Sequence, residues 1–408
     1  MSSQLQDPRR SLRVVSLFSG IGGFELGFKE AGMEPVLFCE SDPSARKVLS
    51  AAWPGVEISE DIRSLEALPD CEVITAGFPC QDLSQAGRKA GIAGDQSGLV
   101  EHLFRLLRGV RSSLKWVVVE NVPYMLGLDR GHAMETLIER FEKLGYSWAY
   151  RVVDSRSFGI PQRRPRVLFV ASPNGFPHAV LLGESARPII DEKPAIIDLD
   201  AVYGFYWTEG WRGLGWVRNG VPPIKGGSGL GIPSPPALWV AATGELGKPS
   251  IHDAERLQGF PGGWTEPAMS LHRSRVGVRW RLIGNAVNVA TAKWLGNRLA
   301  CIAPRPLDIE HLEEFRAVPR WPGAAVGGNG VRLRLPLSPF PETMPMQHIG
   351  TFLEEPLTPL SQKAALGFLN RALSTPKLVY SPMFLNSLRA YCGLLESYVY
   401  TGKLKAAS

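Results

Sequence analysis

Short apolar runs alternate with amphipathic stretches over residues 12–171, and this alternation constrains the possible fold more than any other feature of the chain. The apolar runs, which predict strands, are LRVVSLF, PVLFCE, CEVITAGF, WVVVENV and PRVLFVA. The stretches between them, which predict helices, are GFELGFKEAG, PSARKVLSAAW, LVEHLFRLLRGV and METLIERFEKLG. Nearly continuous apolar strands separated by helices are typical of a parallel sheet with helices on both faces. We therefore expect an α/β fold with a doubly wound sheet.

The composition changes after residue 171, where glycine, proline and tryptophan become frequent and helical patterns become rare. This change predicts a smaller, loop-rich or β-rich second domain. We expect domains at residues 1–171 and 172–270, a return to the first domain at 271–303, and a C-terminal extension of unknown role at 304–408. A helix is expected in the extension, with Ser361 as its N-cap. Four tryptophans are predicted to form the core of the second domain: Trp207, Trp211, Trp216 and Trp239.

Composition limits the classes of function that the chain can have. The formal net charge of +6 favours a polyanionic partner. The five cysteines are scattered without a CxxC pair, so the sequence predicts neither a disulfide framework nor a zinc site. No apolar run approaches the roughly 18 residues of a membrane span, and no apolar stretch follows the N-terminal arginines as in a signal peptide. These features are typical of a protein of a reducing compartment, the cytoplasm, with no metal and no membrane partner.

A glycine-rich turn follows the first predicted strand in LFSGIGGFELGF. A strand, a glycine turn and a helix in succession allow backbone N–H groups to meet an anionic ligand. The dinucleotide pattern G-x-G-x-x-G fails, because Glu25 occupies its third glycine position. Glu40 ends the next predicted strand about 20 residues on, where an acidic side chain typically binds ribose hydroxyls. Tight packing of the helix is the alternative explanation of the turn. Together with Glu40, however, the turn indicates a nucleoside cofactor that lacks a pyrophosphate.

Glu40, Cys80 and Glu120 each follow the carboxyl end of a predicted strand. Ligands bind at this edge of open α/β sheets. Most single cysteines are buried structural residues, as we expect for Cys39 and Cys71 in their apolar strands. Cys80 differs because it follows a proline and precedes the polar loop QDLSQAG. We therefore expect Cys80 to be a presented, reactive thiol.

Six blocks of the chain, in order, resemble the signature motifs of the DNA cytosine carbon-5 methyltransferases. They are FSGIGGF, GFPCQDLS, ENVP, FGIPQRRPR, ERLQGFP and GNAV, and they cover residues 14 to about 300. The resemblance implies a Rossmann-like fold that binds S-adenosyl-L-methionine, joined to a small target-recognition domain. It also implies the transfer of a methyl group to carbon 5 of cytosine in a short duplex DNA sequence, as in bacterial restriction-modification systems.

The resemblance assigns roles to four catalytic residues. Cys80 would add as a thiolate to carbon 6 of a cytosine flipped out of the duplex, because a thiol is both a strong nucleophile and a competent leaving group. Glu120 would contact ring nitrogen 3 and donate a proton during that attack. Arg164 and Arg166, in the family's Q-x-R-x-R pattern, would support charge at the cytosine carbonyl oxygen.

The cofactor-binding residues are carried over from the family by position, and the DNA-binding residues are polar and cationic side chains of the loop after Cys80 and of the recognition segment. Those expected to bind the cofactor are Phe18, Gly20, Ile21, Gly23, Glu40, Asp61, Ile62, Leu99, Asn285 and Val287. Those expected to contact DNA are Gln81, Ser84, Arg88, Lys89, Arg212, Arg218 and Lys225, to which Lys248 adds a further cation. Ser41 departs from the family, which often has tryptophan there, so we expect either a lower cofactor affinity or another side chain that supports adenine packing. The recognition segment also lacks an obvious Thr-Leu pair.

Two other functions stay open at this point. One is the same reaction on transfer RNA, although the tRNA-acting relatives often read CFT where this chain reads CQD. The other is an inactive DNA-binding regulator, which would have no chemical need for Cys80, Glu120 and Arg164. The partners implied are double-stranded DNA and, optionally, a separately encoded restriction endonuclease. A monomer in the cytoplasm, associated with the nucleoid, is expected.

Overall fold

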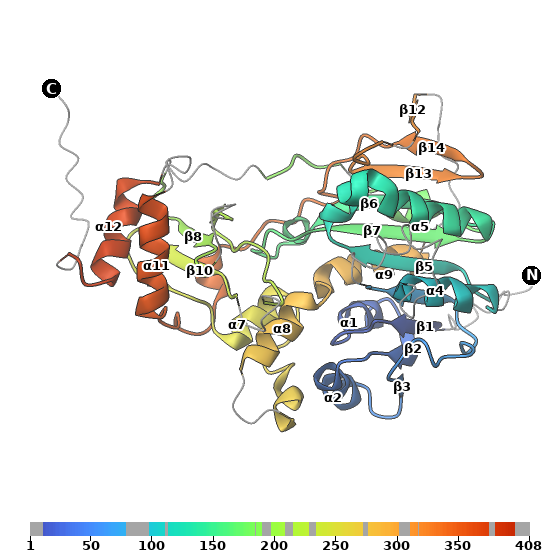
Figure 1. Ribbon diagram of the computed structural model, residues 1–408, viewed down its shortest axis with the longest axis horizontal. Coiled ribbons are helices and arrows are strands. Elements are labelled where there is room, and N and C mark those ends of the chain that lie inside the picture. The colour runs from blue at the N-terminus through green and yellow to red at the C-terminus, as the bar shows by residue number, and fades with distance from the viewer. Residues whose placement is uncertain are drawn as a thin grey trace, which may run out of the picture. The chain divides into compact units, whose positions relative to one another are not determined.

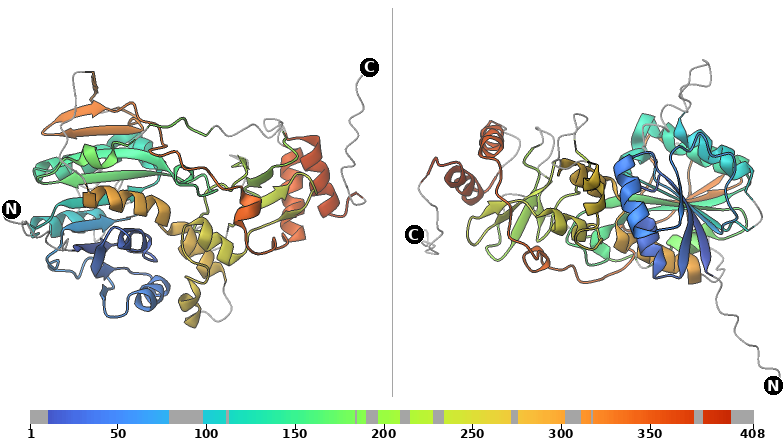
Figure 2. Two further views of the ribbon diagram at one scale, coloured as in Figure 1. Left: turned by 180° about the vertical axis from the view of Figure 1, so that it is seen from behind. Right: turned by 90° about the horizontal axis from the view of Figure 1, so that it is seen from below.

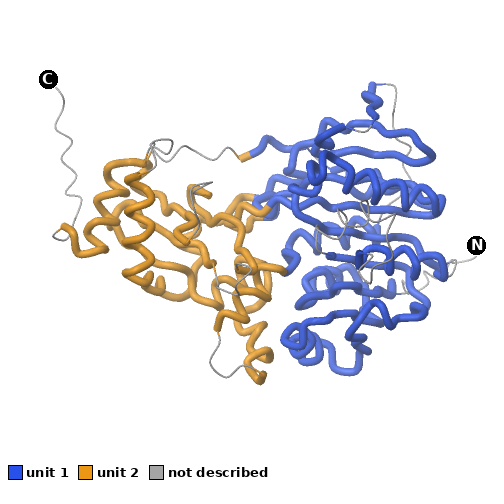
Figure 3. Tube along the Cα trace, in the orientation of Figure 1, with its two compact units in different colours: residues 1–158, 165–188, 286–344 blue, residues 159–164, 189–285, 345–408 orange. Residues whose placement is uncertain are grey.

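The computed structural model describes residues 11–78, 98–110, 113–183, 185–189, 197–208, 215–227, 234–271, 276–301, 311–316, 318–374 and 380–395. The chain divides into two compact units, which Figure 3 shows in different colours. Unit 1 comprises residues 1–158, 165–188 and 286–344, and unit 2 comprises residues 159–164, 189–285 and 345–408. Each unit is therefore assembled from segments that are far apart in the sequence.

Unit 1 contains, within the described residues, a ten-stranded sheet of order β12-β14-β13-β6-β7-β5-β4-β1-β2-β3 (Figure 1). Seven of its strands are β1 (Leu12–Leu17), β2 (Met33–Cys39), β3 (Glu57–Ser59), β4 (Val73–Ala76), β5 (Trp116–Asn121), β6 (Ser147–Asp154) and β7 (Pro165–Ser172). Strands β1 to β5 pair in parallel, whereas β7 is antiparallel to both β5 and β6. The expected parallel orientation of PRVLFVA is therefore wrong, although the strand itself forms as β7.

Helices cover both faces of this sheet (Figure 2). They are α1 (Gly23–Lys29), α2 (Pro43–Ala52), α4 (Leu99–Arg108), α5 (His132–Lys143), α6 (Pro177–Leu181) and α9 (Val289–Cys301), with short 3-10 turns η1 (Pro123–Gly131) and η2 (Ser155–Ser157). Successive strand residues face opposite sides: Val14 and Val118 pack in one cluster with α1 and α9, and Val15 and Val117 in another with α4 and α5. The predicted doubly wound α/β sheet is confirmed.

Local sequence explains where the helices of unit 1 begin and end. The Asp42 carboxylate accepts the Ser44 N–H over 2.8 Å and so caps α2, whose first residue is Pro43. Gly32 and Gly145 follow α1 and α5 with φ of 74° and 78°, a conformation that glycine adopts without steric strain. Each of these helix boundaries is therefore set by a residue type suited to that end of a helix.

The C-terminal extension contributes to both units. Strands β12 (Glu313–Glu314), β13 (Ala324–Gly328) and β14 (Val331–Arg334) belong to unit 1, where β13 pairs antiparallel with β6. Helices α10 (Ile349–Phe352), α11 (Gln362–Leu373) and α12 (Pro382–Tyr391) belong to unit 2. Helix α11 begins directly after Ser361, as predicted, although the serine side chain makes no capping hydrogen bond.

Unit 2 is built on an antiparallel sheet whose described strands have the order β11-β10-β8-β9. Its strands are β8 (Val202–Phe205), β9 (Val217–Arg218), β10 (Ala237–Val240) and β11 (Leu246–Gly247). The remaining elements are α7 (Ile251–Leu257), η3 (Glu266–Ser270) and α8 (Gly277–Asn285).

Aromatic side chains fill the core of unit 2 between the sheet and helices α11 and α12. The rings of Tyr203 and Trp216 stack with centroids 4.8 Å apart, and Trp239 meets Phe384 of α12 edge-on at 5.2 Å. Trp207 is buried in the same cluster. The predicted core role of these three tryptophans is confirmed, and Trp211 lies outside the described residues.

Candidate active site

The carboxylate of Glu120 and the guanidinium of Arg166 form an ion pair at the carboxyl end of β5. Arg166 Nε lies 2.9 Å from Glu120 Oε1, and the two side chains are 15% and 12% exposed. Because β7 is antiparallel to β5, the beginning of β7 lies beside the end of β5, with Glu120 opposite Leu168. An ion pair that is shielded from most solvent favours one position of the carboxylate. The catalytic residues Glu120 and Arg166 predicted from sequence are thus brought together.

Asn121 ties this end of β5 to the end of β4. Its Nδ2 donates a hydrogen bond to the Phe78 carbonyl over 3.1 Å, and its Oδ1 accepts the Val122 N–H over 2.9 Å. Phe78 lies two residues before Cys80. Sequence reasoning missed Asn121, although a buried amide that ends an apolar strand is a usable signal.

Cys80 itself lies outside the described residues, as do Gln81, Ser84, Arg88 and Lys89. Among the described cysteines, Cys39 and Cys71 are buried, and burial raises the pKa of their thiols to about 11 and about 12. Both therefore stay protonated at neutral pH. The prediction that these two cysteines are structural is confirmed.

The glycine turn after β1 is organised by Glu40. Glu40 Oε2 accepts the Gly20 N–H over 2.7 Å and Oε1 accepts the Asp42 N–H over 2.8 Å, while burial raises the pKa of the carboxyl. Phe18 and Gly20 have left-handed φ values of 58° and 57°. A non-glycine residue in this conformation is strained and persists where its surroundings impose it. A carboxylate has about four acceptor sites, and three backbone donors, Gly20, Asp42 and Ser41, act on this one, so it can accept a further hydrogen bond from a ligand hydroxyl.

Close packing surrounds the turn on its helix side. A Cβ on Gly23 would lie 2.4 Å from the Val287 carbonyl oxygen, and one on Gly22 would lie 2.4 Å from the Trp53 ring. Ile21, between these glycines, is buried. The first residue of α1 therefore touches the GNAV block, which is more than 250 residues away in the sequence, and the structure brings Gly23 and Val287 together as expected.

The DIRS turn contributes an aspartate that already has a partner. The Asp61 carboxylate accepts hydrogen bonds from Arg63 Nε and N–H, which lower its pKa. Ile62 is buried, and its carbonyl accepts Arg105 Nη2 from α4 over 3.1 Å. Leu99, the first residue of α4, packs against the same apolar cluster. Arg105, which the sequence analysis did not single out, thus fastens this turn to α4.

Arg164 belongs to unit 2, and its contacts differ from those of Arg166. It is 2% exposed, and its Nη1 and Nη2 donate to the carbonyls of Ile224 and Gly284, each over 3.0 Å. Asn285, which follows Gly284, lies against Gly226. Both acceptors are backbone carbonyls of unit 2, and the catalytic role expected for Arg164 stays a prediction.

Two of the cations expected to contact DNA, Arg218 and Lys225, have side-chain partners in unit 2. Arg218 pairs with the Asp198 carboxylate, with side chains 41% and 36% exposed. The ammonium of Lys225 lies 4.0 Å from the centre of the Tyr206 ring, a cation–π contact. Arg212 lies outside the described residues.

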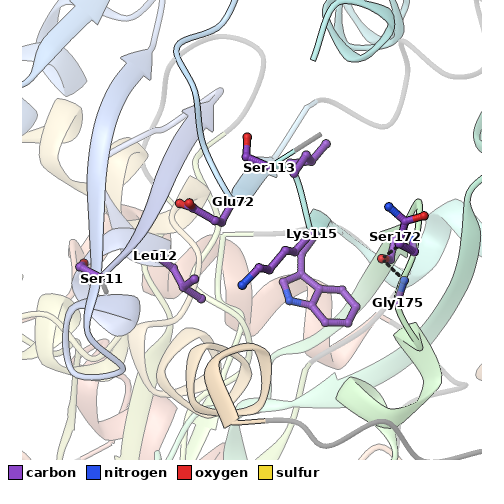
Figure 4. A pocket seen from close by; sticks show the side chains of 10 residues that line it. Ser11, Leu12, Glu72, Ser113, Lys115, Ser172 and Gly175 are labelled. Atoms are coloured by element: carbon purple, nitrogen blue, oxygen red, sulfur yellow. Dashed lines mark hydrogen bonds between the residues drawn. The ribbon is translucent and has the colours of Figure 1, made fainter. Parts of the chain in front are cut away.

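Unit 1 has a cavity of about 550 Å³ at the amino ends of its parallel strands, away from the carboxyl ends that carry Glu40 and Glu120 (Figure 4). Its lining includes Leu12 and Trp116, at the amino ends of β1 and β5, and Glu72, which precedes β4. The strand ends that carry Glu40 and Glu120 are therefore not part of it. Within the described residues there is no group of His, Cys, Asp or Glu arranged to hold a metal ion. In the same part of the chain, no helix has the length and apolar character needed to cross a membrane.

Comparison with known proteins agrees with this arrangement. A family model described as C-5 cytosine-specific DNA methylase matches residues 12–208. The type II methyltransferase M2.BsuMI of Bacillus subtilis (strain 168) is 47% identical over 381 residues, which cover 92% of this chain and 97% of that protein. The type II methyltransferase M.DsaV of Dactylococcopsis salina is 29% identical over 339 residues, 76% of this chain and 91% of that protein. The crystal structure of S. pombe Dnmt2 methyltransferase covers 71% of this chain and 98% of its own with a TM-score of 0.52 and 19% identity, which shows a shared fold.

The large mixed sheet, with a glycine turn at the carboxyl end of its first strand, is the fold of a Rossmann-like methyltransferase. The chain belongs to the family of C-5 cytosine-specific DNA methylases, and it is a DNA (cytosine-5-)-methyltransferase of the restriction-modification type.

Proposed function

We propose that this chain methylates cytosine in a short duplex DNA sequence through a covalent bond between Cys80 and carbon 6 of an extruded base. The observation that carries the proposal is the Glu120–Arg166 pair at the end of β5, tied through Asn121 to Phe78. This arrangement supplies an oriented carboxyl group beside the strand end from which the chain continues to Cys80. Such a group is suited to proton transfer at a base that a nearby thiolate attacks.

The proposed steps use the chain's own residues as follows. The Cys80 thiolate forms a bond to carbon 6 while Glu120 donates a proton to ring nitrogen 3, which leaves carbon 5 electron-rich. Carbon 5 then acquires the methyl group, a base removes its proton, and the electron pair left behind expels the thiolate. Arg166 keeps the Glu120 carboxyl in place and carries positive charge beside the base. S-adenosyl-L-methionine, when bound, supplies the methyl group as an activated sulfonium.

The residues of unit 1 fit a nucleoside cofactor. The Glu40 carboxylate can accept a further hydrogen bond beside those from its backbone donors, and no residue of the turn Phe18–Gly23 has a charged side chain. We propose that Glu40 accepts the ribose hydroxyls and that Asp61 accepts the adenine amine, with Ile62 and Leu99 beside the ring. The turn Phe18–Gly23, with Val287 and Asn285, would bind the remainder of the cofactor.

Target recognition is proposed for residues 172–270, which include Arg218 and Lys225. Arg218 would exchange its half-exposed bond to Asp198 for a phosphate, and Lys225 would contact a phosphate or a base edge. Flipping the cytosine out of the duplex costs a few kcal/mol, which contacts to the extruded base and the backbone must offset. A monomer acting on chromosomal DNA in the cytoplasm, with or without a restriction endonuclease encoded elsewhere, agrees with this function.

One experiment tests the proposed substrate. Bisulfite sequencing of DNA from cells that express the chain should show methylated cytosines within one short sequence, and cells expressing Cys80→Ser should show none. Purified protein should transfer labelled methyl groups to duplex DNA and not to transfer RNA. Methylation of transfer RNA alone would overturn the DNA assignment, and binding of DNA with no transfer to either substrate would indicate an inactive regulator.

A further inference from the structure

The segment Pro161–Arg164 lies against Val221–Ile224 within unit 2. The Arg163 N–H donates to the Val221 carbonyl and the Val221 N–H donates to the Pro161 carbonyl, each over 2.9 Å. The Gln162 side chain accepts the Ile224 N–H over 3.1 Å and donates to the Leu257 carbonyl over 2.8 Å. Backbone and side-chain bonds together therefore fix Arg164 relative to the recognition segment.

Arg164 joins this segment to the end of α8. Its two terminal nitrogens donate to the carbonyls of Ile224 and Gly284, which are 60 residues apart in the sequence. A Cβ on Gly284 would lie 2.2 Å from the backbone carbon of Lys225, so the two backbones are in direct contact there. A buried guanidinium is stable only when its donors are satisfied, and these two carbonyls provide acceptors. The Lys225 backbone and the last turn of α8 are thus held as one piece.

Gly226 and Asn285 meet directly beside this contact. A Cβ on Gly226 would lie 2.1 Å from Asn285 Oδ1. Gly226 is not among the glycines with a left-handed φ, so its backbone suits any residue and the constraint is steric. The absence of a side chain at residue 226 therefore decides where the Asn285 amide can lie.

We propose that Arg164 is a positioning residue and that, with Gly226, it sets the position of Asn285, so that binding of DNA and binding of the cofactor are coupled. The inference rests on the proposed function, in which Lys225 contacts DNA and Asn285 contacts the cofactor. Lys225 lies between Ile224, which Arg164 binds, and Gly226, which touches Asn285. A DNA contact that orders Lys225 therefore orders Asn285 as well, and by linkage each ligand tightens the other by the same factor.

The steric step is tested by a double-mutant cycle on S-adenosyl-L-methionine affinity, measured by calorimetry. Gly226→Ala should weaken binding about tenfold or more while leaving thermal stability unchanged, because the end of the Asn285 side chain can rotate away. Asn285→Ala should weaken binding by a similar factor, and the double variant should bind no more weakly than Asn285→Ala alone. Gly367→Ala is the matched control, since its Cβ would lie 3.4 Å from Arg371 Nη1 and the residue is inside α11.

The coupling is tested with S-adenosylhomocysteine, which cannot donate a methyl group, and a duplex that carries the methylated sequence. In the wild-type chain each ligand should tighten the other about fivefold or more. Arg164→Lys keeps the positive charge but lacks the planar guanidinium that donates to both carbonyls. The factor by which each ligand tightens the other should therefore fall toward one. Gly226→Ala should also abolish the coupling between the two ligands. This variant tests the inference independently in case Arg164→Lys does not fold.

The outcomes separate this inference from the proposed function. Additive effects of Gly226→Ala and Asn285→Ala, or unchanged coupling in Gly226→Ala, would overturn the inference while leaving the proposed function intact. A wild-type chain that binds neither S-adenosyl-L-methionine nor S-adenosylhomocysteine would contradict the proposed function and this inference together.

Discussion

The side-chain amide of Asn121 donates a hydrogen bond to the backbone carbonyl of Phe78 over 3.1 Å. Asn121 follows Glu120 at the end of β5, and Phe78 follows β4, the neighbouring parallel strand. The bond therefore links the strand end that carries the proposed acid to the strand end that leads to the proposed nucleophile. Errors of about 1 Å in such a geometry reduce rates strongly.

Asn121→Ala should slow methyl transfer by about tenfold or more and lower the free energy of unfolding by about 1–3 kcal/mol, since the buried Phe78 carbonyl loses its donor. Single-turnover kinetics and urea unfolding measure the two effects. Ser147→Ala is the control, because the Ser147 hydroxyl donates to the carbonyls of Ser172 and Gly175 at the far end of β7. If Asn121→Ala and Ser147→Ala transfer the methyl group at equal rates under conditions in which both are folded, Asn121 has no positioning role.

Glu40→Ala should weaken S-adenosyl-L-methionine binding by about 1–3 kcal/mol. The substitution removes the proposed ribose acceptor and also releases the Gly20 N–H that Glu40 binds. Cys80→Ser should bind the cofactor as the wild type does, since the thiol acts on the base. Calorimetry that shows unchanged affinity for Glu40→Ala would remove the ribose assignment.

Glu25 should make the stability of the protein depend on pH. Its carboxyl is buried beneath α1, where it accepts a hydrogen bond from Thr75, and burial raises its pKa from 4.5 to about 7. The folded state therefore holds the proton more tightly than the unfolded chain does. The stability from this group is complete below pH 4.5 and is lost as the pH rises toward 7, in total about 3 kcal/mol.

Glu25→Gln keeps the shape of the side chain and cannot ionise, so it should abolish this dependence. Urea unfolding at pH 5 and pH 8 compares the two proteins. The wild type should lose more stability than Glu25→Gln between these values, and parallel changes in both proteins would show that Glu25 titrates normally.

The sequence predicted strands β1, β2, β4, β5 and β7 and helices α1, α2, α4 and α5, because their periodicity and end signals are local. Strands β3 and β6 were missed: β3 has three residues, and in β6 the polar residues Ser147, Arg151 and Asp154 interrupt the apolar run. The direction of β7 was not predictable in this way, since a strand that is apolar on both faces reads the same in either orientation. Strands β12 to β14 were also missed, because β12 has two residues and β13 contains Gly327 and Gly328.

The candidate site was predicted through its motifs, and what the motifs omitted were contacts between distant residues. Asn121 and Phe78 are 43 residues apart, and Arg164 and Gly284 are 120 apart. No local pattern indicates that Arg166 pairs with Glu120 while Arg164, two residues earlier, binds carbonyls of unit 2. That difference follows from the chain entering β7 at Pro165.

DNA affinity should fall steeply with salt, because bound lysines and arginines release counterions from the phosphates. For about 4–8 phosphate contacts, log affinity against log salt should have a slope of about −0.9 per contact, and Arg218→Ala should reduce the slope by about one contact. Arg140→Ala is the control, since Arg140 pairs with Glu101 on α4 of unit 1. A nearly flat dependence in the wild type would count against duplex DNA as the substrate.

Covalent capture tests the central claim most directly. With 5-fluorocytosine in the target sequence, carbon 5 can accept the methyl group but has no proton to lose, so the thiolate cannot be expelled. The wild-type chain should form a denaturation-resistant complex with this duplex that requires S-adenosyl-L-methionine. Cys80→Ser should form none, and Glu120→Gln should form it far more slowly while still binding DNA. A persistent complex in Cys80→Ser, or none in the wild type, would contradict the proposed mechanism.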